Sequence, residues 1–308
     1  MIYVQLIAGF VLLLGGAEVL VRGAIALAKR LEISPLIIGM TVVALGTSAP
    51  ELVVSLDAAL LGSPGIALGN VIGSNIANLL LILGAVGMVM PIAAKPDGLW
   101  RDGLILLGGS LLFAALCWSG IIGLWPGMLL LAVFVAFLGH SYWRETRNGG
   151  EAEMGVQEVV EIRGVPASVT AAWLVLAAGL AGVVYGADLL VMGGVAVAEA
   201  AGVSEEVIGL TLIAFGTSLP ELAASMVAAW RGHADIALGN VVGSNLFNML
   251  LIVGVVAVVT PLLVPIQIMA FDLWVMLAAT VLFLPFLVGG LRFGRQRVLQ
   301  VQRGERKV

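Results

Sequence analysis

Apolar runs of about twenty residues with almost no charge recur along the whole chain. Each run is long enough to cross roughly 30 Å of hydrocarbon as an α-helix. Of the 308 residues, 61% are apolar and 11% are charged, whereas a soluble domain is roughly half apolar and about a quarter charged. We therefore predict an all-α polytopic membrane protein with about nine spans, at residues 3–25, 34–61, 66–91, 103–119, 122–143, 168–198, 205–230, 236–261 and 267–289.

The basic residues of the connections fall on one side of the predicted membrane. The connections after spans one, three, five and seven carry Lys29, Arg30, Lys95, Arg101, Arg144, Arg147, Arg163 and Arg231, and six more basic residues follow the ninth span. The connections after spans two, four, six and eight carry none. By the positive-inside rule, we expect the N-terminus outside and the basic C-terminal tail in the cytoplasm.

The chain matches itself without gaps at an offset of 170 residues, and residues 39–84 and 209–254 are identical at 27 of 46 positions. Five spans separate the copies, so we predict that they cross the membrane in opposite directions, as in secondary transporters with inverted repeats and broken helices at the midplane. A duplication without functional meaning does not explain why identity concentrates on polar residues inside the spans. The predicted organisation is a first repeat of five spans (1–143), a cytoplasmic linker (144–166), and a second repeat of four spans plus the basic tail (167–308).

Each copy carries a proline motif near the middle of a span, GTSAPE at residues 46–51 and GTSLPE at residues 216–221. Pro50 and Pro220 lack an N–H, so each leaves a carbonyl without its helical partner. Beside the breaks stand two pairs of hydroxyls and two carboxylates: Thr47, Ser48 and Glu51, and Thr217, Ser218 and Glu221. No basic residue of these spans lies at that depth, and a buried acid is costly. We therefore predict a bound cation, and oxygen ligands of this kind suit Na+ and Ca2+.

A second motif follows each proline motif, GSNIAN at residues 73–78 and GSNLFN at residues 243–248. Its serine and last asparagine are four residues apart and therefore share one helical face. This makes Ser74, Asn78, Ser244 and Asn248 candidate ligands at the depth of the carboxylates. Asn70, Asn75, Asn240 and Asn245 suit helix packing as well as ion binding.

Several other polar residues receive weaker predictions. The sequence assigns no charged neighbour to Glu18 or Asp57, and we expect Asp57 to face an outer vestibule. His140 and His233 lie at interfacial positions, where we expect them to be solvated. The chain has no phosphate-binding glycine loop, no His/Cys cluster and no nucleophile–base pair in its sequence, so we predict neither an enzyme, nor a resident cofactor, nor a nucleic-acid partner.

The paired motifs GTSAPE…GSNIAN and GTSLPE…GSNLFN resemble those of the cation/calcium exchanger superfamily, specifically the prokaryotic sodium/calcium exchangers. The resemblance implies that Glu51 and Glu221 are the central calcium ligands, with Asn78 at the same site. It further implies side-chain or backbone ligands at this and the flanking sodium sites: Thr47, Thr217, Ala44 and Ala214 through their carbonyls, and Ser48, Ser74, Ser218 and Ser244 through their hydroxyls. It also implies that the first and sixth spans slide to alternate access, in a prokaryotic plasma (inner) membrane.

This chain departs from the family pattern at two points. Archaeal exchangers place an aspartate where this chain has Asn248, so its centre holds only two carboxylates. Family members have ten spans, whereas this chain turns polar and basic after about residue 290.

Together these features predict an antiporter that exchanges Na+ for Ca2+ by alternating access, with these ions and the lipid bilayer as its partners and no obligatory protein partner. Three alternatives stay open: proton-driven exchange of Ca2+ or another divalent cation on the same fold, an intramembrane hydrolase that uses Ser or Thr with Glu, and a channel. The hydrolase lacks a general base, and two identical sites are rare in catalysis.

Overall fold

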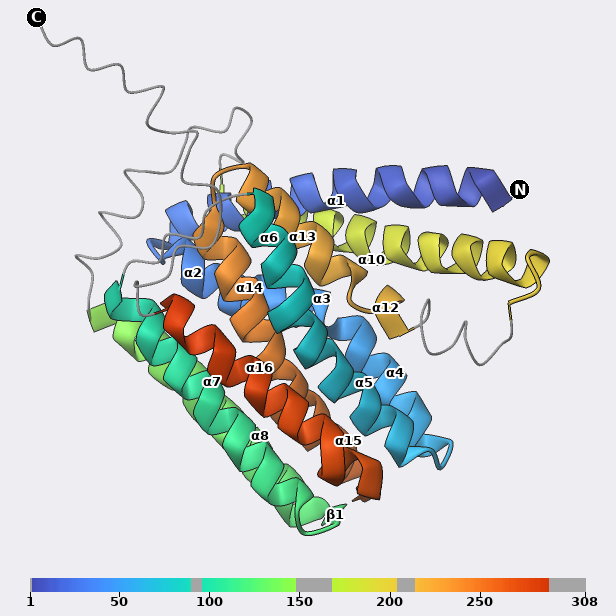
Figure 1. The fold of residues 1–308 in the computed structure, drawn as a ribbon. Coiled ribbons are helices and arrows are strands. Elements are labelled where there is room, and N and C mark those ends of the chain that lie inside the picture. Colours follow the sequence, from blue (N-terminus) through green and yellow to red (C-terminus); the bar gives the residue numbers. More distant parts are fainter. Residues whose placement is uncertain (1, 90–95, 148–167, 204–213, 288–308) are drawn as a thin grey trace, which may run out of the picture.

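The computed structural model describes residues 2–89, 96–147, 168–203 and 214–287, and these residues form an almost entirely helical protein (Figure 1). The first half comprises α1 (Ile2–Leu31), α2 (Pro35–Ile38), the π-helix η1 (Gly39–Val43), α3 (Ala44–Thr47), α4 (Ala49–Leu60), α5 (Pro64–Ala77), the π-helix η2 (Asn78–Ile82), α6 (Leu83–Val89), α7 (Pro96–Cys117) and α8 (Leu124–Arg147). The second half comprises α10 (Val169–Ala200), α12 (Ala214–Gly216), α13 (Leu219–Trp230), α14 (Ala234–Leu246), the π-helix η4 (Phe247–Ile252), α15 (Val253–Val259), the π-helix η5 (Ile268–Asp272) and α16 (Leu273–Leu287).

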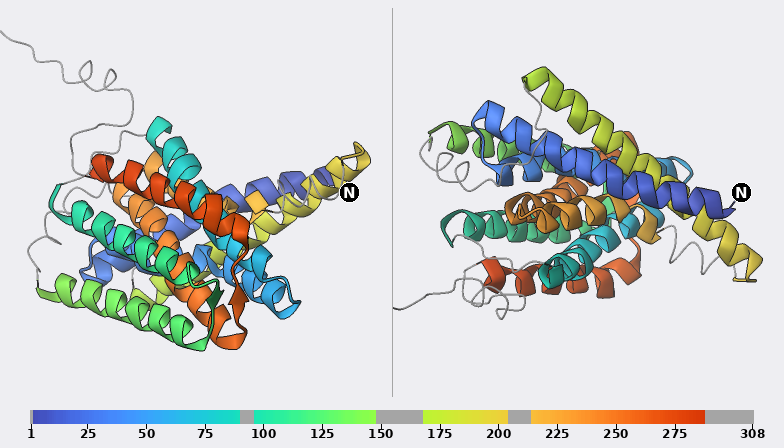
Figure 2. Two further views of the ribbon diagram at one scale, coloured as in Figure 1. Left: turned by 60° about the horizontal axis from the view of Figure 1, so that its bottom comes forward. Right: turned by 90° about the horizontal axis from the view of Figure 1, so that it is seen from above.

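Helices α1 and α10 form a long pair that crosses the remaining helices at a wide angle (Figures 1 and 2). Glycines spaced by seven residues let the two backbones touch, at positions 9, 16 and 23 of α1 and 179, 186 and 193 of α10. A Cβ atom added at Gly179 would lie 2.2 Å from the backbone nitrogen of Leu20, and one at Gly186 would lie 2.4 Å from that of Leu13. Because the contact partner moves backward along α1 as the chain moves forward along α10, the pair is antiparallel.

The helices that carry the proline motifs are interrupted at the predicted point. The segment α2–η1–α3 ends at Thr47, α4 begins at Ala49, and the two parts are bent by 42°. In the second half, α12 ends at Gly216 and α13 begins at Leu219, while residues 204–213 lie outside the described part of the chain. The predicted break at each proline motif is therefore confirmed.

Helices α5 and α14 carry the second motif and run on through a π-helical turn. The turn η2 begins at Asn78, and η4 contains Asn248. Such π-helical insertions are frequent at functional sites. Helix α14 lies in the middle of the bundle, where every residue from Ile236 to Leu246 is buried. The two asparagines therefore sit in the protein interior and not at the lipid-facing surface.

Helices α7, α8 and α16 cover the outer side of this core (Figure 2). Arg144 of α8 pairs with the buried Asp102 of α7 at 3.2 Å. The loops at the opposite end are joined by two short antiparallel strands, β1 (Ile121–Ile122) and β2 (Leu262–Leu263).

Within the described residues, six helices are long and apolar enough to cross a membrane, or up to seven if the bent pair before and after Ser48 counts as one span. The protein is thus a helical membrane protein, as predicted. The number of nine spans stays a prediction, because α7 of span four is not among these helices and part of span seven lies outside the described residues.

Candidate functional site

Glu51 and Glu221 occupy equivalent places in the two halves. Each lies in the first turn of the helix that follows the break, α4 or α13, where the positive end of the helix dipole favours a negative charge. Both residues are only 1% exposed. Among the described residues, neither oxygen of Glu51 and only Oε1 of Glu221 has a hydrogen-bond partner. Two buried carboxylates with free oxygens are what a cation site requires.

Hydrogen bonds across the two halves bring both motifs into one cluster. The Ser48 hydroxyl donates to Oε1 of Glu221 at 3.1 Å, and the Ser218 hydroxyl donates to that of Ser74 at 3.4 Å. Ser244 is fully buried, and its hydroxyl has no partner in the part of the chain that is described. The structure thus brings Ser48 to the carboxylate of the other half and joins Ser218 to Ser74 across the two halves.

Asn70 and Asn240 fasten the broken helices beside each carboxylate. The Asn70 amide nitrogen donates to the Glu51 carbonyl at 3.3 Å and to the Ser55 hydroxyl at 3.0 Å. The Asn240 amide nitrogen makes the equivalent bonds, to the Glu221 carbonyl at 3.4 Å and to the Ser225 hydroxyl at 3.0 Å. These asparagines therefore pack and position helices. Their serine partners, Ser55 and Ser225, were not predicted, although they recur at the same offset of 170 residues as the motifs.

The threonines and alanines of the proline motif lie at the same break. Thr47 is buried, and its hydroxyl donates to Oδ1 of Asn240 at 3.2 Å and to the Ala44 carbonyl at 3.4 Å. Thr217 is half-buried between α12 and α13. Ala214 begins α12, and only its backbone is described. Their predicted roles as carbonyl ligands stay predictions.

Four buried asparagines of the second motif form a network between α5 and α14–η4. The Asn78 amide nitrogen donates to Oδ1 of Asn245 at 3.0 Å, and the Asn248 amide nitrogen donates to Oδ1 of Asn75 at 3.1 Å. The Asn75 amide nitrogen donates in turn to the Asn245 carbonyl at 3.4 Å. Among the described residues, Oδ1 of Asn78 and Oδ1 of Asn248 have no partner. Both amides therefore keep an oxygen available for a ligand.

No basic side chain pairs with either carboxylate among the described residues; Arg22 and Arg231 pair with Glu18, and Arg144 pairs with Asp102. No cluster of three or more His, Cys, Asp or Glu residues exists among the described residues either. The site consequently combines two formal negative charges with neutral hydroxyl and amide oxygens. Hard cations such as Na+ and Ca2+ prefer this ligand set, whereas softer transition metals prefer nitrogen and sulfur.

Two predictions about residues outside the site are wrong. Glu18 does have charged neighbours: it pairs with Arg22 one turn away and with Arg231 at the end of α13, each at 2.8 Å. His233 is not solvated but 6% exposed, in the turn between α13 and α14. Its burial, and to a smaller extent the nearby charge of Lys29, lower the pKa of His233. His140 is exposed, as expected; Asp57 is exposed as well, and its place in an outer vestibule stays a prediction.

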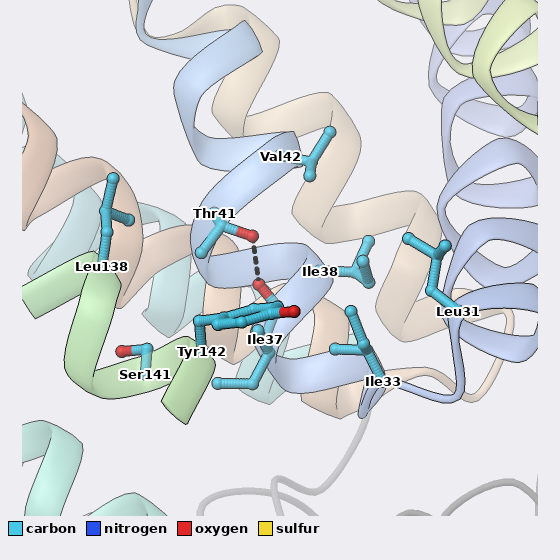
Figure 3. A pocket seen from close by; sticks show the side chains of 9 residues that line it. All are labelled: Leu31, Ile33, Ile37, Ile38, Thr41, Val42, Leu138, Ser141 and Tyr142. Carbon is cyan, nitrogen blue, oxygen red and sulfur yellow. Dashed lines mark hydrogen bonds between the residues drawn. The ribbon is translucent and has the colours of Figure 1, made fainter. Parts of the chain in front are cut away.

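A cavity of about 210 Å³ opens elsewhere, between the C-terminal end of α1, the α2–η1 segment and α8 (Figure 3). Its lining is apolar apart from three hydroxyl-bearing residues, one of which, Thr41, donates its hydroxyl to the Ile37 carbonyl at 2.6 Å. None of the candidate ligands lines it. This cavity is therefore not the cation site.

The fold defines a helical membrane protein whose interior contains carboxylate and amide oxygens of the kind that hard cations prefer. The chain belongs to the family described as "Sodium/calcium exchanger protein", whose model matches residues 1–143 and 171–301. CaxA of Alkalimonas amylolytica is 40% identical over 292 residues, which cover 94% of this chain and 90% of that protein. The sodium/calcium exchanger MaX1 of Methanosarcina acetivorans is 32% identical, with 95% of this chain and 93% of that protein covered.

A solved structure of the sodium-calcium exchanger NCX_Mj, soaked with 2.5 mM Na+ and 0.1 mM Ca2+, matches with a TM-score of 0.80 and 32% identity. The match covers 96% of this chain and 92% of that chain. The resemblance inferred from the paired motifs is confirmed by these comparisons.

Proposed function

We propose that this protein exchanges Na+ for Ca2+ across the membrane by alternating access to one site between its halves. The observation that carries the proposal is the pair of buried carboxylates, Glu51 and Glu221, three of whose four oxygens have no hydrogen-bond partner among the described residues. The names of the similar proteins MaX1 and NCX_Mj, both sodium/calcium exchangers, support the choice of ions.

The charge of the site explains why the two ions exclude each other. Two carboxylates carry a charge of −2, which one Ca2+ or two Na+ balance equally well. Both loads need the same oxygens, so they compete. A site without a cation would bury two unpaired charges, which is costly in the protein interior. The carrier therefore changes its access mainly when it is loaded, and this couples the two fluxes.

The remaining ligands follow from the symmetry of the site. We assign the flanking sodium ligands to the hydroxyls of Ser48, Ser74, Ser218 and Ser244 and the carbonyls of Ala44 and Ala214. Thr47 and Thr217 contribute carbonyls, and Asn78 and Asn248 contribute amide oxygens at the centre. The hydrogen bonds that join the serines to the site support this assignment.

The inverted-repeat architecture is part of the proposal. The antiparallel contact of α1 and α10 supports it, because the two helices occupy equivalent places at the offset of 170 residues. The family model matches two stretches of the chain, which also fits two repeats. The glycine-lined contact holds α1 and α10 closely together, so the pair can slide past the core as one unit, with the N-terminus outside and the C-terminal tail in the cytoplasm.

The exchange is tested in proteoliposomes loaded with Na+, by measuring uptake of calcium-45 after dilution into medium without Na+. We expect uptake that requires the outward Na+ gradient and disappears in Glu51→Gln and Glu221→Gln. Asp57→Asn is the matched control, because it removes an exposed acid from the same helix as Glu51. Uptake driven by an imposed pH gradient without Na+ would replace this function by proton-coupled exchange, and uncoupled, non-saturating flux would indicate a channel.

The orientation is tested with cysteines at the equivalent, exposed helix ends Leu60 and Trp230, in a Cys117→Ser background. Inverted repeats predict that an impermeant thiol reagent reaches Leu60→Cys from outside and Trp230→Cys from the cytoplasm. Labelling of both from the same side would refute the inversion.

A further inference from the structure

We propose that Asn75 is a positioning residue that turns the amide oxygen of Asn248 toward the bound cation. The inference rests on the proposed function, since it concerns the same site. It starts from a chain of hydrogen bonds that runs from the Asn245 carbonyl through Asn75 to Asn248. All three residues are at most 1% exposed, so water does not readily replace these bonds.

The backbone sets the direction of this chain. A carbonyl oxygen only accepts hydrogen bonds, so Asn75 must present its amide nitrogen to the Asn245 carbonyl, at 3.4 Å. The side-chain oxygen of Asn75 then faces Asn248, which must answer with its own amide nitrogen, at 3.1 Å. The remaining oxygen of Asn248 is buried and has no partner among the described residues. Asn75 thus decides which end of the Asn248 amide is free.

The orientation matters because the two ends of an amide are opposite in character. The oxygen is an acceptor that binds a cation, whereas the NH2 group is a donor that repels one. If Asn248 turned over, a donor would point into the site. Without the acceptor on Asn75, nothing in this chain of bonds opposes that turn.

The same geometry selects an amide at position 248. An aspartate there has no N–H to donate, so its carboxylate would meet the oxygen of Asn75. Asn75 could relieve this contact only by turning over, which would break its bond to the Asn245 carbonyl. The two-carboxylate centre of this chain and the acceptor on Asn75 therefore belong together.

In the other half, Asn78 donates to Oδ1 of Asn245 at 3.0 Å. The nitrogen of Asn245 has no partner in the described structure, so its direction is not anchored by a carbonyl. Asn245 provides a comparison residue of the same type, burial and motif position, whose acceptor serves Asn78 and not Asn248.

The test is equilibrium binding of calcium-45 to the full-length protein in detergent without Na+, in a double-mutant cycle. Asn75→Leu removes the acceptor at similar side-chain volume, and we expect Ca2+ affinity to fall at least tenfold. In an Asn248→Asp background, the same substitution should change affinity less than threefold, because a carboxylate presents an oxygen whichever way it turns. Asn245→Leu should lower affinity equally in the parent and in Asn248→Asp, and should be rescued only by Asn78→Asp.

Equal losses from Asn75→Leu in the parent and Asn248→Asp backgrounds would overturn the proposal, because a merely structural role does not depend on the residue at position 248. Unchanged affinity in Asn75→Leu would overturn it as well. If Asn75→Leu does not fold, Asn75→Ala makes the same comparison with a smaller side chain. Absence of Ca2+ binding in the parent protein would instead refute the proposed function itself.

Discussion

Replacing one site carboxylate by its amide should separate a cation-binding role from a structural role by the sign of its effect on stability. Glu51→Gln and Glu221→Gln keep the shape of the side chain and remove half of the formal charge of the site. Without ions, each substitution removes a buried charge that has no basic partner among the described residues. We therefore expect the unfolding temperature of the ion-free protein to rise and not to fall.

With Ca2+ the effect reverses. Removing one partner of a buried charge pair costs about 3–5 kcal/mol, which corresponds to an affinity lowered by between about 100-fold and about 5,000-fold. At a Ca2+ concentration of about 100 times the dissociation constant, the parent protein gains about 2.7 kcal/mol of stability from the ligand. A 100-fold weaker variant gains only about 0.4 kcal/mol at the same concentration.

The assay is thermal unfolding in detergent, followed with and without Ca2+ for the parent, the two Gln variants and the control Asp57→Asn. We expect Ca2+ to raise the unfolding temperature of the parent and the control, and hardly to change that of the Gln variants. The reasoning would be refuted if a Gln variant were less stable than the parent without ions but still gained the full stabilisation from Ca2+. Glu51 or Glu221 would then be a structural residue.

Three further comparisons test the serines of the site, the contact between α1 and α10, and the turn after α13. Ser48→Ala removes a hydrogen bond to a carboxylate and should lower stability by about 1.5–3 kcal/mol, whereas Ser218→Ala removes one to a neutral hydroxyl and should lower it by about 0.5–1.5 kcal/mol. Chemical denaturation measures both losses, and a larger loss in Ser218→Ala than in Ser48→Ala would contradict the prediction. Gly186→Ala should lower stability by about 1–3 kcal/mol and abolish transport, because the added Cβ would meet the backbone of α1. The control Gly15→Ala, whose Cβ would meet nothing within 4 Å, should change neither stability nor transport. Burial lowers the pKa of His233, so the unfolded chain binds more protons than the folded one, and stability should fall as the pH drops below about 6.5. His233→Gln should flatten this dependence of the unfolding temperature on pH. An unchanged slope would contradict the prediction.

The sequence predicted the helical membrane fold because the bilayer leaves few alternatives. Backbone groups in lipid must bond internally, so a long apolar run is a helix. The break at each proline motif was equally predictable, since Pro50 and Pro220 cannot donate to a helical carbonyl. The π-helical turns at Asn78 and Asn248 were not predicted, because their residues follow the same apolar pattern as an α-helix.

The candidate ligands were predictable from motifs, but their partners were not. The rule that relates residues four positions apart applies within one helix, whereas Asn75 and Asn245 meet residues of the other half of the chain. The pairing of Glu18 with Arg231 was not predictable for the same reason, since Arg231 lies 213 residues away in sequence, whereas its partner Arg22 lies four residues away and the rule would have indicated it. His233 was expected at an aqueous interface, but the turn after α13 places it in the protein interior.

The central claim is that Na+ and Ca2+ compete for one site formed by Glu51 and Glu221. It is tested most directly by the apparent dissociation constant for calcium-45, measured over a series of Na+ concentrations in the parent protein. Since two Na+ match the charge of one Ca2+, we predict a dissociation constant that rises with Na+, with a slope of about two on a double-logarithmic plot. A dissociation constant that does not change with Na+ would contradict the account.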